Sequence, residues 1–312
     1  MSLSINQITA ASFPAVLTEK RKPTNQWAES AFLREMQRQG MISKKSLGPT
    51  IEHTLDYQRN PGATTLATDM STVSLAKVEV LTAASYTPGE MSVPVTWTKG
   101  DEAKNPTENQ KVDFVASLLS NAIDSHDDLL EEILFSTSTN GILGLQNILP
   151  SNGFGSPGGI DAGVEAWWRN WSSFYATNGS DIEAQLEEAF NVTSKGSGGS
   201  QPTLIVSGAD AQAVYTGQQV SNIRYVDARE ADAGFMKVFF KTAPWIFSQY
   251  GGTRIYGLNK GSFKLVVSKD YFRDLGEMSE IPNANAFTRK LYSMLQFTTS
   301  AKSRGFVLRS GS

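Results

Sequence analysis

The sequence of 312 residues contains no cysteine and only two histidines, His53 and His126. The absence of cysteine excludes disulfide bonds, thiolate nucleophiles and cysteine-based zinc sites. Two histidines leave little material for a metal centre, which usually needs three or four convergent ligands, or for a Ser-His-Asp site. The composition therefore predicts a protein that is not an enzyme and that has no metal and no cofactor.

Long apolar runs are also lacking. No stretch approaches the roughly 18 consecutive apolar residues that a membrane helix needs. The opening residues, MSLSINQITAASF, have neither a basic leader nor a continuous apolar core, so we predict no signal peptide. We expect a protein that is made and used in soluble form, long enough for two domains or sub-domains.

Charge is sparse and unevenly distributed. Charged residues make up 19% of the chain, and the net charge is -3. Residues 1–60 carry +3, residues 61–150 carry -8 and residues 151–312 carry +2. A negative chain gives no general electrostatic case for nucleic-acid binding. The acidic middle either contacts basic segments, of this chain or of a neighbour, or forms solvated faces.

The first hundred residues divide into an arm and a projection. Residues 1–45 are polar with scattered apolar anchors, which is typical of an arm that packs on another surface. In TIEHTLDYQ (50–58) and MSVPVTWT (91–98), apolar and polar residues alternate, as in strands. A long stretch rich in Thr, Ser, Ala, Gly and Pro separates them. This arrangement predicts an extended hairpin that projects from the core, because long loops are uncommon inside compact domains.

One long helix is predicted from Asn105 to Ser136. Asn105 suits the N-cap, and Pro106 suits the first turn. Apolar residues recur at three- and four-residue steps and form one stripe: Val112, Val115, Leu119, Ala122, His126, Leu129 and Ile133. About 30 residues make a rod of roughly 45 Å. We expect such a rod to lie across a sheet or under a hairpin.

The rest of the chain predicts a mixed α/β layer followed by strands. The Gly- and Pro-rich segment 140–159 indicates a change of direction and a sub-domain boundary. Helical and strand patterns then alternate to about residue 250, and the last 60 residues or so are mostly strand. The fold class is therefore α+β.

Motifs with chemical meaning are weak. GFGSPG (153–158) has dinucleotide-site spacing, but its proline and polar surroundings favour a plain turn. SHDD (125–128) resembles a metal-binding pair, yet no second ligand shares the helical face of His126, so we expect a packed, hydrogen-bonded imidazole. Packing is also expected for His53. IVSGAD around Ser207 lacks the first glycine of a nucleophile elbow, and no phosphate-binding loop occurs.

An aromatic group lies at helical spacing in residues 167–174: Trp167, Trp168, Trp171 and Phe174. Such a group can stack bases or sugars. It is more often part of a core or a subunit interface, and we favour that interpretation.

A polar arm, a projecting hairpin, a long rod helix and an α/β lobe bury little surface within one copy. Assembly would supply the missing burial, since obligate interfaces are large and apolar. The sequence therefore predicts a self-assembling structural protein.

The order of these segments resembles that of the major capsid proteins of tailed bacteriophages, which have the Hong Kong 97-type fold. TIEHTLDYQRNPGA leading to MSVPVTWTKGDEAKNP resembles the extended loop and its return. NGILGLQNIL, WWRNW, FMKVFFKTAPWIF, YGLNKGSFKLVV and LQFTTSAKSRGFVLRSG resemble later segments of that family. The resemblance implies an N-terminal arm at 1–48, an extended β-hairpin loop at 49–104, a spine helix of the peripheral domain at 105–138, an axial domain at 139–254 and return strands of the peripheral domain at 255–312.

The resemblance also implies a function. The chain would form pentamers and hexamers of an icosahedral head around double-stranded DNA, which it would contact non-specifically. Assembly would take place in the host bacterial cytoplasm, and the protein would then reside in the virion. A separate scaffold, a portal and decoration proteins are candidate partners. On this hypothesis, deleting about residues 65–88 should abolish closed shells and leave a soluble body.

Residues expected at subunit contacts come from the arm, the extended loop and the axial lobe. They are Trp27, Phe32, Leu66, Val73, Leu75, Val78, Tyr86, Met91, Arg224, Tyr225 and Arg229. Alternative functions are an encapsulin-like nanocompartment shell, a different virion component such as a tail tube, and a monomeric hydrolase or carbohydrate-binding module that uses the tryptophans.

Overall fold

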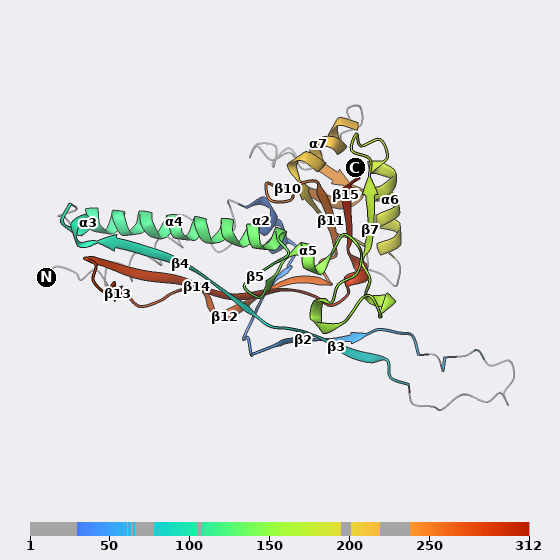
Figure 1. The fold of residues 1–312 in the computed structure, drawn as a ribbon, viewed down its shortest axis with the longest axis horizontal. Coiled ribbons are helices and arrows are strands. Elements are labelled where there is room, and N and C mark those ends of the chain that lie inside the picture. Colours follow the sequence, from blue (N-terminus) through green and yellow to red (C-terminus); the bar gives the residue numbers. More distant parts are fainter. Residues whose placement is uncertain are drawn as a thin grey trace.

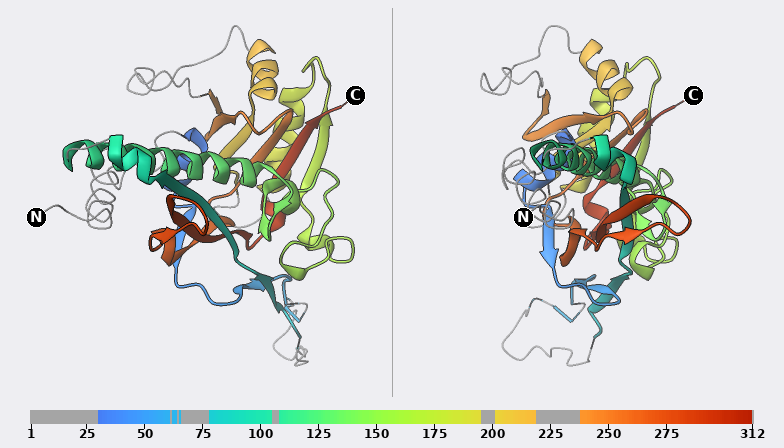
Figure 2. Two further views of the ribbon diagram at one scale, coloured as in Figure 1. Left: turned by 60° about the vertical axis from the view of Figure 1, so that its left-hand side comes forward. Right: turned by 90° about the vertical axis from the view of Figure 1, so that its left-hand side faces the viewer.

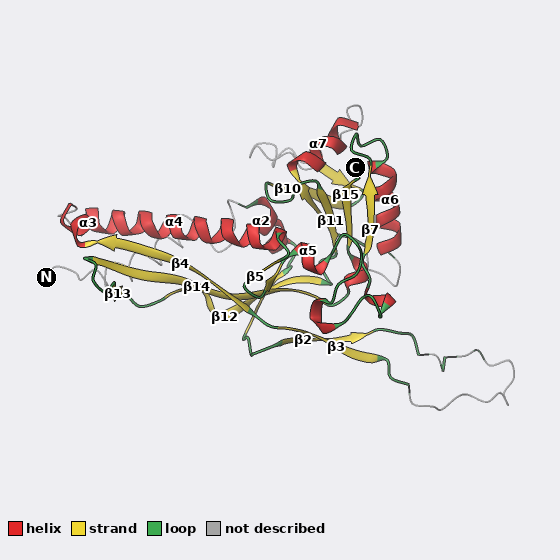
Figure 3. Ribbon diagram, viewed as in Figure 1, coloured by secondary structure: helices red, strands yellow, loops and turns green. Residues whose placement is uncertain are grey.

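The structure is a computed structural model that describes residues 30–60, 62, 63, 65, 78–104, 108–194, 201–218 and 238–311. A long helix lies along one sheet, a second lobe rises at one end, and a hairpin extends away from both (Figure 1). Helices and strands are mixed in both lobes, as Figure 3 shows. No helix in the described ranges combines the length and apolarity that crossing a membrane requires.

The first sheet contains the longest strands. Its order is β1-β12-β14-β13, and β4 also pairs with β14. The strands are β1 (Ile42–Lys45), β4 (Gly89–Thr98), β12 (Phe263–Leu275), β13 (Ser279–Glu280) and β14 (Ala286–Thr299). The prediction that 91–98 returns from the hairpin to the body is confirmed. Its partner differs from the expected strand at 51–57, since β4 pairs with β14 from Thr98↔Ala286 to Gly89↔Leu295.

Helix α4 (Glu108–Phe135) lies on this sheet and follows the short helix α3 (Lys99–Lys104). Val115, Leu119 and Ala122 are buried against Val95 and Trp97 of β4. His126 and Ile133 are also buried, while Leu129 is only partly covered. The predicted stripe is therefore confirmed from Val115 onward, with Leu130 in the place of Leu129. Asn105, Pro106 and the packing of Val112 fall outside the described residues.

Residues 30–45 form part of the body. Ser30 caps helix α2 (Ala31–Arg38) by accepting a hydrogen bond of 3.1 Å from the Leu33 N–H. Phe32, Leu33 and Met36 enter the core that joins the two lobes, and β1 pairs in parallel with β12. This part of the predicted arm thus packs on its own chain. Its apolar residues recur at helical spacing and supply the buried face.

Strands β2 (Ile51–Asp56) and β3 (Leu81–Tyr86) form the projecting hairpin, which both views of Figure 2 show leaving the body. They pair antiparallel from Ile51↔Tyr86 to Asp56↔Leu81. The prediction of a hairpin is confirmed, but its second strand is 81–86. Only one face of this ribbon is buried, which explains the alternating pattern of 51–57.

The second sheet belongs to the second lobe and has the order β7-β15-β11-β8-β10-β9. Its strands are β7 (Trp171–Tyr175), β8 (Leu204–Gly208), β9 (Val238–Phe240), β10 (Ala243–Ser248), β11 (Arg254–Leu258) and β15 (Phe306–Ser310). Helices α6 (Ile182–Thr193) and α7 (Ala209–Gln218) pack on it. The resemblance implied that residues 255–312 are return strands of the peripheral domain. Within this range, β11 and β15 pair in the second sheet. Their central residues are buried on both faces, with Tyr256 and Val307 in one core and Ile255 and Leu308 in the other.

The connection between the lobes contains short elements. These are β5 (Ser138–Thr139), β6 (Ile142–Leu143), α5 (Leu145–Ile148) and the 3-10 turns η3 (Pro157–Gly159), η4 (Ala166–Trp168) and η5 (Lys302–Arg304). GFGSPG forms a turn, as predicted, with positive φ at Gly153, Gly155 and Gly158. The aromatic group does not form one helix: η4 ends at Trp168, and strand β7 starts at Trp171.

Candidate functional site

A buried polar network joins α4 to the first sheet. His126 Nε2 lies 2.8 Å from Ser293 Oγ, and His126 Nδ1 lies 3.3 Å from Asp127 Oδ1. Arg273 forms an ion pair with Asp127, and its backbone N–H donates to Ser293 Oγ at 2.9 Å. The prediction of a packed, hydrogen-bonded His126 is confirmed.

This Ser-His-Asp arrangement does not have the geometry of a catalytic site. Ser293 and His126 are fully buried, so no substrate can reach the hydroxyl. Arg273 occupies the carboxylate that would orient the imidazole in a hydrolase. Burial lowers the pKa of His126, which keeps the ring neutral at physiological pH. The network therefore holds the helix to the sheet.

A β-bulge places Arg273 in this network. The pairing of β12 with β14 shifts register between Phe272 and Asp274. Arg273 has a φ of 56°, which is uncommon for a residue other than glycine. The bulge turns the side chain inward, where it is 4% exposed.

The foot of the hairpin is fixed to the body by buried contacts. Tyr86 donates a 2.8 Å hydrogen bond to the Thr299 carbonyl, and Trp168 Nε1 donates to the Pro157 carbonyl at 3.1 Å. His53 contacts Thr298 Oγ1 at 3.1 Å, as its predicted packing requires. Gly158 has a φ of 70°, and a Cβ there would lie 2.8 Å from that of Ala84. The hairpin therefore leaves the body from a rigid base.

Buried Lys302 holds the turn beneath this base. Its Nζ donates to the carbonyl oxygens of Phe154 at 2.5 Å and Gly153 at 3.4 Å. Burial lowers the pKa of Lys302 to about 8, and the charge of Asp161 offsets part of that effect. The amine thus connects η5 to the 151–159 turn by hydrogen bonds to backbone carbonyl groups.

Lys302 should give stability a characteristic pH dependence. Between about pH 8 and 10.5 the unfolded chain keeps a proton on this amine that the folded chain has lost. Hence the free energy of unfolding of the wild type should rise relative to that of Lys302→Met across this window, by up to about 1.4 kcal/mol per pH unit. Urea unfolding at several pH values measures the difference. Lys260→Met, at an exposed lysine, is the control; a difference for Lys302→Met that stays flat with pH contradicts the assignment.

Apolar side chains are exposed around the hairpin foot. Leu81 of β3 is 62% exposed and Val164 is 76% exposed. Both line a depression of about 470 Å³ together with Ile160 and Trp167. Other large apolar residues are exposed elsewhere on the described surface: Phe154, Phe174 of β7, Phe247 of β10 and Tyr271 of β12. Glu79, Asp161 and Glu165 also line this depression, so the exposed apolar side chains lie beside acidic ones. Exposed apolar side chains at the base of a projection are candidates for a protein–protein contact.

The residues predicted at subunit contacts are found in different places. Phe32, Tyr86 and Met91 are buried inside this chain, where they pack in its own cores. Val78 is half-buried just before β3. The others lie outside the described residues: Trp27, Leu66, Val73, Leu75, Arg224, Tyr225 and Arg229. Sequence reasoning missed Leu81 and Val164, because a single exposed apolar residue in a polar context gives no periodic signal.

Comparison with solved structures identifies this architecture. The cyanophage A-1(L) capsid protein superposes with a TM-score of 0.61 at 15% identity, over 87% of this chain and 90% of that chain. A protein of the satellite phage P4 procapsid superposes with a TM-score of 0.53 at 11% identity, over 97% of both chains. The SrpI encapsulin of Synechococcus elongatus superposes with a TM-score of 0.50 at 10% identity, over 86% of this chain and 85% of that chain. The sequence matches no protein-family model and no curated protein.

These structures share one fold with this chain over most of its length. The chain thus has the Hong Kong 97-type capsid fold, in the α+β class that the sequence predicted.

Proposed function

We propose that this chain is a major capsid protein that assembles into pentamers and hexamers of an icosahedral bacteriophage head around double-stranded DNA. The observation that carries the proposal is the shared fold, which covers about nine-tenths of both this chain and the cyanophage capsid protein. The role is structural. The one Ser-His-Asp arrangement in the described residues is sealed inside the body.

The geometry supplies a mechanism for assembly. A rigid foot directs the hairpin away from the body, so the hairpin is free to overlap a neighbour. Apolar side chains exposed at the foot would be covered by that neighbour, at roughly 25 cal/mol per Å² of apolar surface buried. On this proposal the hairpin and its foot are the extended-loop contact of the shell.

An encapsulin-like nanocompartment is the second candidate, because the SrpI encapsulin has the same fold. The content of the particle separates the two functions. Particles isolated from the source should contain nuclease-protected double-stranded DNA if the capsid proposal holds. Shells filled with a protein cargo and free of DNA would support the nanocompartment instead.

A further inference from the structure

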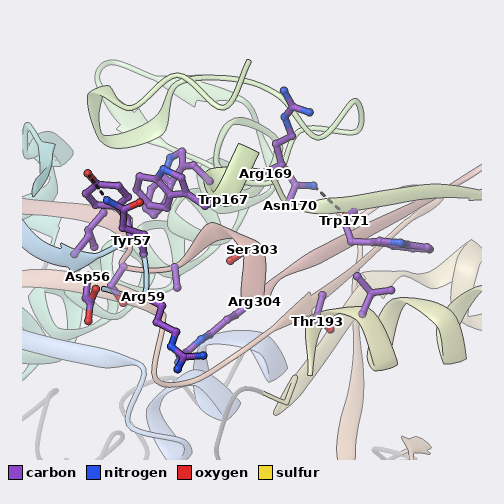
Figure 4. A pocket seen from close by; sticks show the side chains of 16 residues that line it. Asp56, Tyr57, Arg59, Trp167, Arg169, Asn170, Trp171, Thr193, Ser303 and Arg304 are labelled. Atoms are coloured by element: carbon purple, nitrogen blue, oxygen red, sulfur yellow. Dashed lines mark hydrogen bonds between the residues drawn. The ribbon is translucent and has the colours of Figure 1, made fainter. Parts of the chain in front are cut away.

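A pocket of about 830 Å³ lies between the hairpin foot and the body (Figure 4). Four segments from different parts of the chain line it: residues 55–59 at the end of β2, residues 167–171 between η4 and β7, residues 192–193 at the end of α6, and residues 300–304 around η5. The pocket therefore forms where the projecting hairpin, the second lobe and the return to β15 meet.

Two arginines in this pocket have no polar partner among the residues that the structure describes. The side chains of Arg59 and Arg304 extend to the same end of it in Figure 4. Neither guanidinium forms an ion pair or a hydrogen bond with any part of the chain that the structure describes. The third arginine, Arg169, donates to the carbonyls of Ala162 at 2.7 Å and Gly163 at 2.8 Å and points away from the other two.

The pocket therefore has a positive charge that the described part of the chain leaves without a counter-charge. Asp56 is the one carboxylate among its lining residues, against three arginines. Two guanidinium groups at the same end repel each other unless an anion lies between them. Carboxylates suit the position, because a guanidinium binds a carboxylate through two parallel hydrogen bonds.

The remaining walls suit a peptide better than a nucleic acid. The ring centroids of Tyr57 and Trp167 lie 5.3 Å apart in a stacked arrangement, and those of Trp167 and Trp168 lie 5.4 Å apart. These three rings are therefore already in contact with one another. Binding of a base requires an open aromatic face. Asn170 is 5% exposed and lines the same pocket, and its side-chain oxygen has no hydrogen-bond partner in the described ranges. A peptide offers N–H donors in addition to carboxylates.

We propose that this pocket binds a carboxylate-bearing segment of a second copy of this chain. The inference rests on the proposed function, since it assumes that copies assemble. Charge complementarity favours this occupant: the chain has a net charge of -3 and carries its acidic excess between residues 61 and 150. Part of that excess is exposed on successive turns of α4, at Asp124, Asp128 and Glu132. The pocket would thus lock the hairpin foot of one copy to an acidic surface of the next.

Charge reversal tests the pocket. Arg59→Glu with Arg304→Glu should lower the yield of assembled particles at least tenfold, because carboxylates would then face carboxylates. Particle yield is measured by sedimentation, and the far-ultraviolet circular dichroism of the unassembled fraction should stay unchanged. Lys260→Glu with Lys290→Glu is the matched control, because it makes the same charge change at exposed lysines outside the pocket. Equal yields from both double variants overturn the inference.

Cross-linking identifies the occupant and keeps the test open if the reversed variant fails to fold. Arg59→Lys and Arg304→Lys keep the charge and supply an amine, which a carbodiimide joins to a carboxylate in direct contact. In particles assembled from ¹⁴N- and ¹⁵N-labelled chains, we expect position 59 or 304 of one copy to be joined to Asp or Glu of another. Cross-links confined to one copy overturn the inference, as does loss of bound nucleic acid from the reversed variant without loss of assembly.

The two proposals fail differently. A wild-type chain that forms no particles contradicts the proposed function itself. Wild-type particles that form equally well with reversed charges at Arg59 and Arg304 contradict only the pocket assignment.

Discussion

Replacing residues 60–77 with Asn-Gly should abolish closed particles and leave the chain folded. Strands β2 and β3 pair in a register that continues beyond them, since the Tyr57 N–H donates to the Val80 carbonyl at 3.1 Å. The same register places Arg59 opposite Val78, where a two-residue turn closes an antiparallel hairpin. The replacement therefore shortens the hairpin but keeps its foot.

The structure sharpens the deletion that the sequence suggested. Removing residues 65–88 would also remove β3, and with it Ala84 and Tyr86 of the buried foot. Loss of assembly could then follow from a damaged body. With the Asn-Gly replacement we expect a melting temperature within about 5 °C of the wild type, since the packed cores are untouched.

Electron microscopy and differential scanning calorimetry on the same preparation measure both outcomes. A control that replaces residues 60–77 with an equally long Gly/Ser segment separates the effect of side chains from that of length. Intact closed particles from the Asn-Gly variant would contradict the role that we propose for the hairpin.

Asp127→Ala should destabilise the folded chain by about 3–5 kcal/mol. The substitution leaves Arg273 buried without its carboxylate and removes the partner of His126 Nδ1. An uncompensated buried charge is more costly than the loss of the pair as a whole. Urea unfolding at neutral pH measures the change in the free energy of unfolding.

A double-mutant cycle assigns that cost to the pair. Asp127→Leu with Arg273→Met should cost less than either Asp127→Leu or Arg273→Met alone, because no charge remains buried. Asp270→Ala, on the exposed part of β12, is the control and should stay within about 0.5 kcal/mol of the wild type. Additive losses at positions 127 and 273 would show that the two side chains do not stabilise each other.

Periodicity predicted the parts of the fold that a local pattern determines. The stripe on α4 was predictable because Val115, Leu119 and Ala122 all face one sheet, and a helix has a fixed period. A projecting hairpin was predictable because apolar and polar residues alternate in residues 50–58 and 91–98, and because a long, weakly apolar stretch separates them. Its exact second strand was not, because residues 81–86 (LTAASY) carry small residues and a weak strand pattern.

Long-range pairing was the main part that the sequence did not determine. Residues 254–258 and 306–310 have the same apolar character as β12 and β14, yet they pair in the other sheet. The residues of a strand do not by themselves determine which sheet it joins or which apolar surface covers it. The sequence pattern therefore predicted strands at these positions but did not determine which sheet they join.

The polar contacts of the site depended on the same missing information. SHDD drew attention to His126 and Asp127, but their partners Ser293 and Arg273 lie more than 140 residues away in sequence. Lys302 looks like an ordinary surface lysine in AKSRG. Its burial follows from the turn at Gly153 and Phe154, which only the folded chain brings to it.

Sedimentation velocity of the purified full-length chain over a range of concentrations tests the central claim most directly. If a single copy leaves surface that only other copies can cover, most of the protein should sediment as closed particles or capsomers many times larger than 34.0 kDa. A 34.0 kDa species that does not grow with concentration or in assembly-promoting salt would contradict the account.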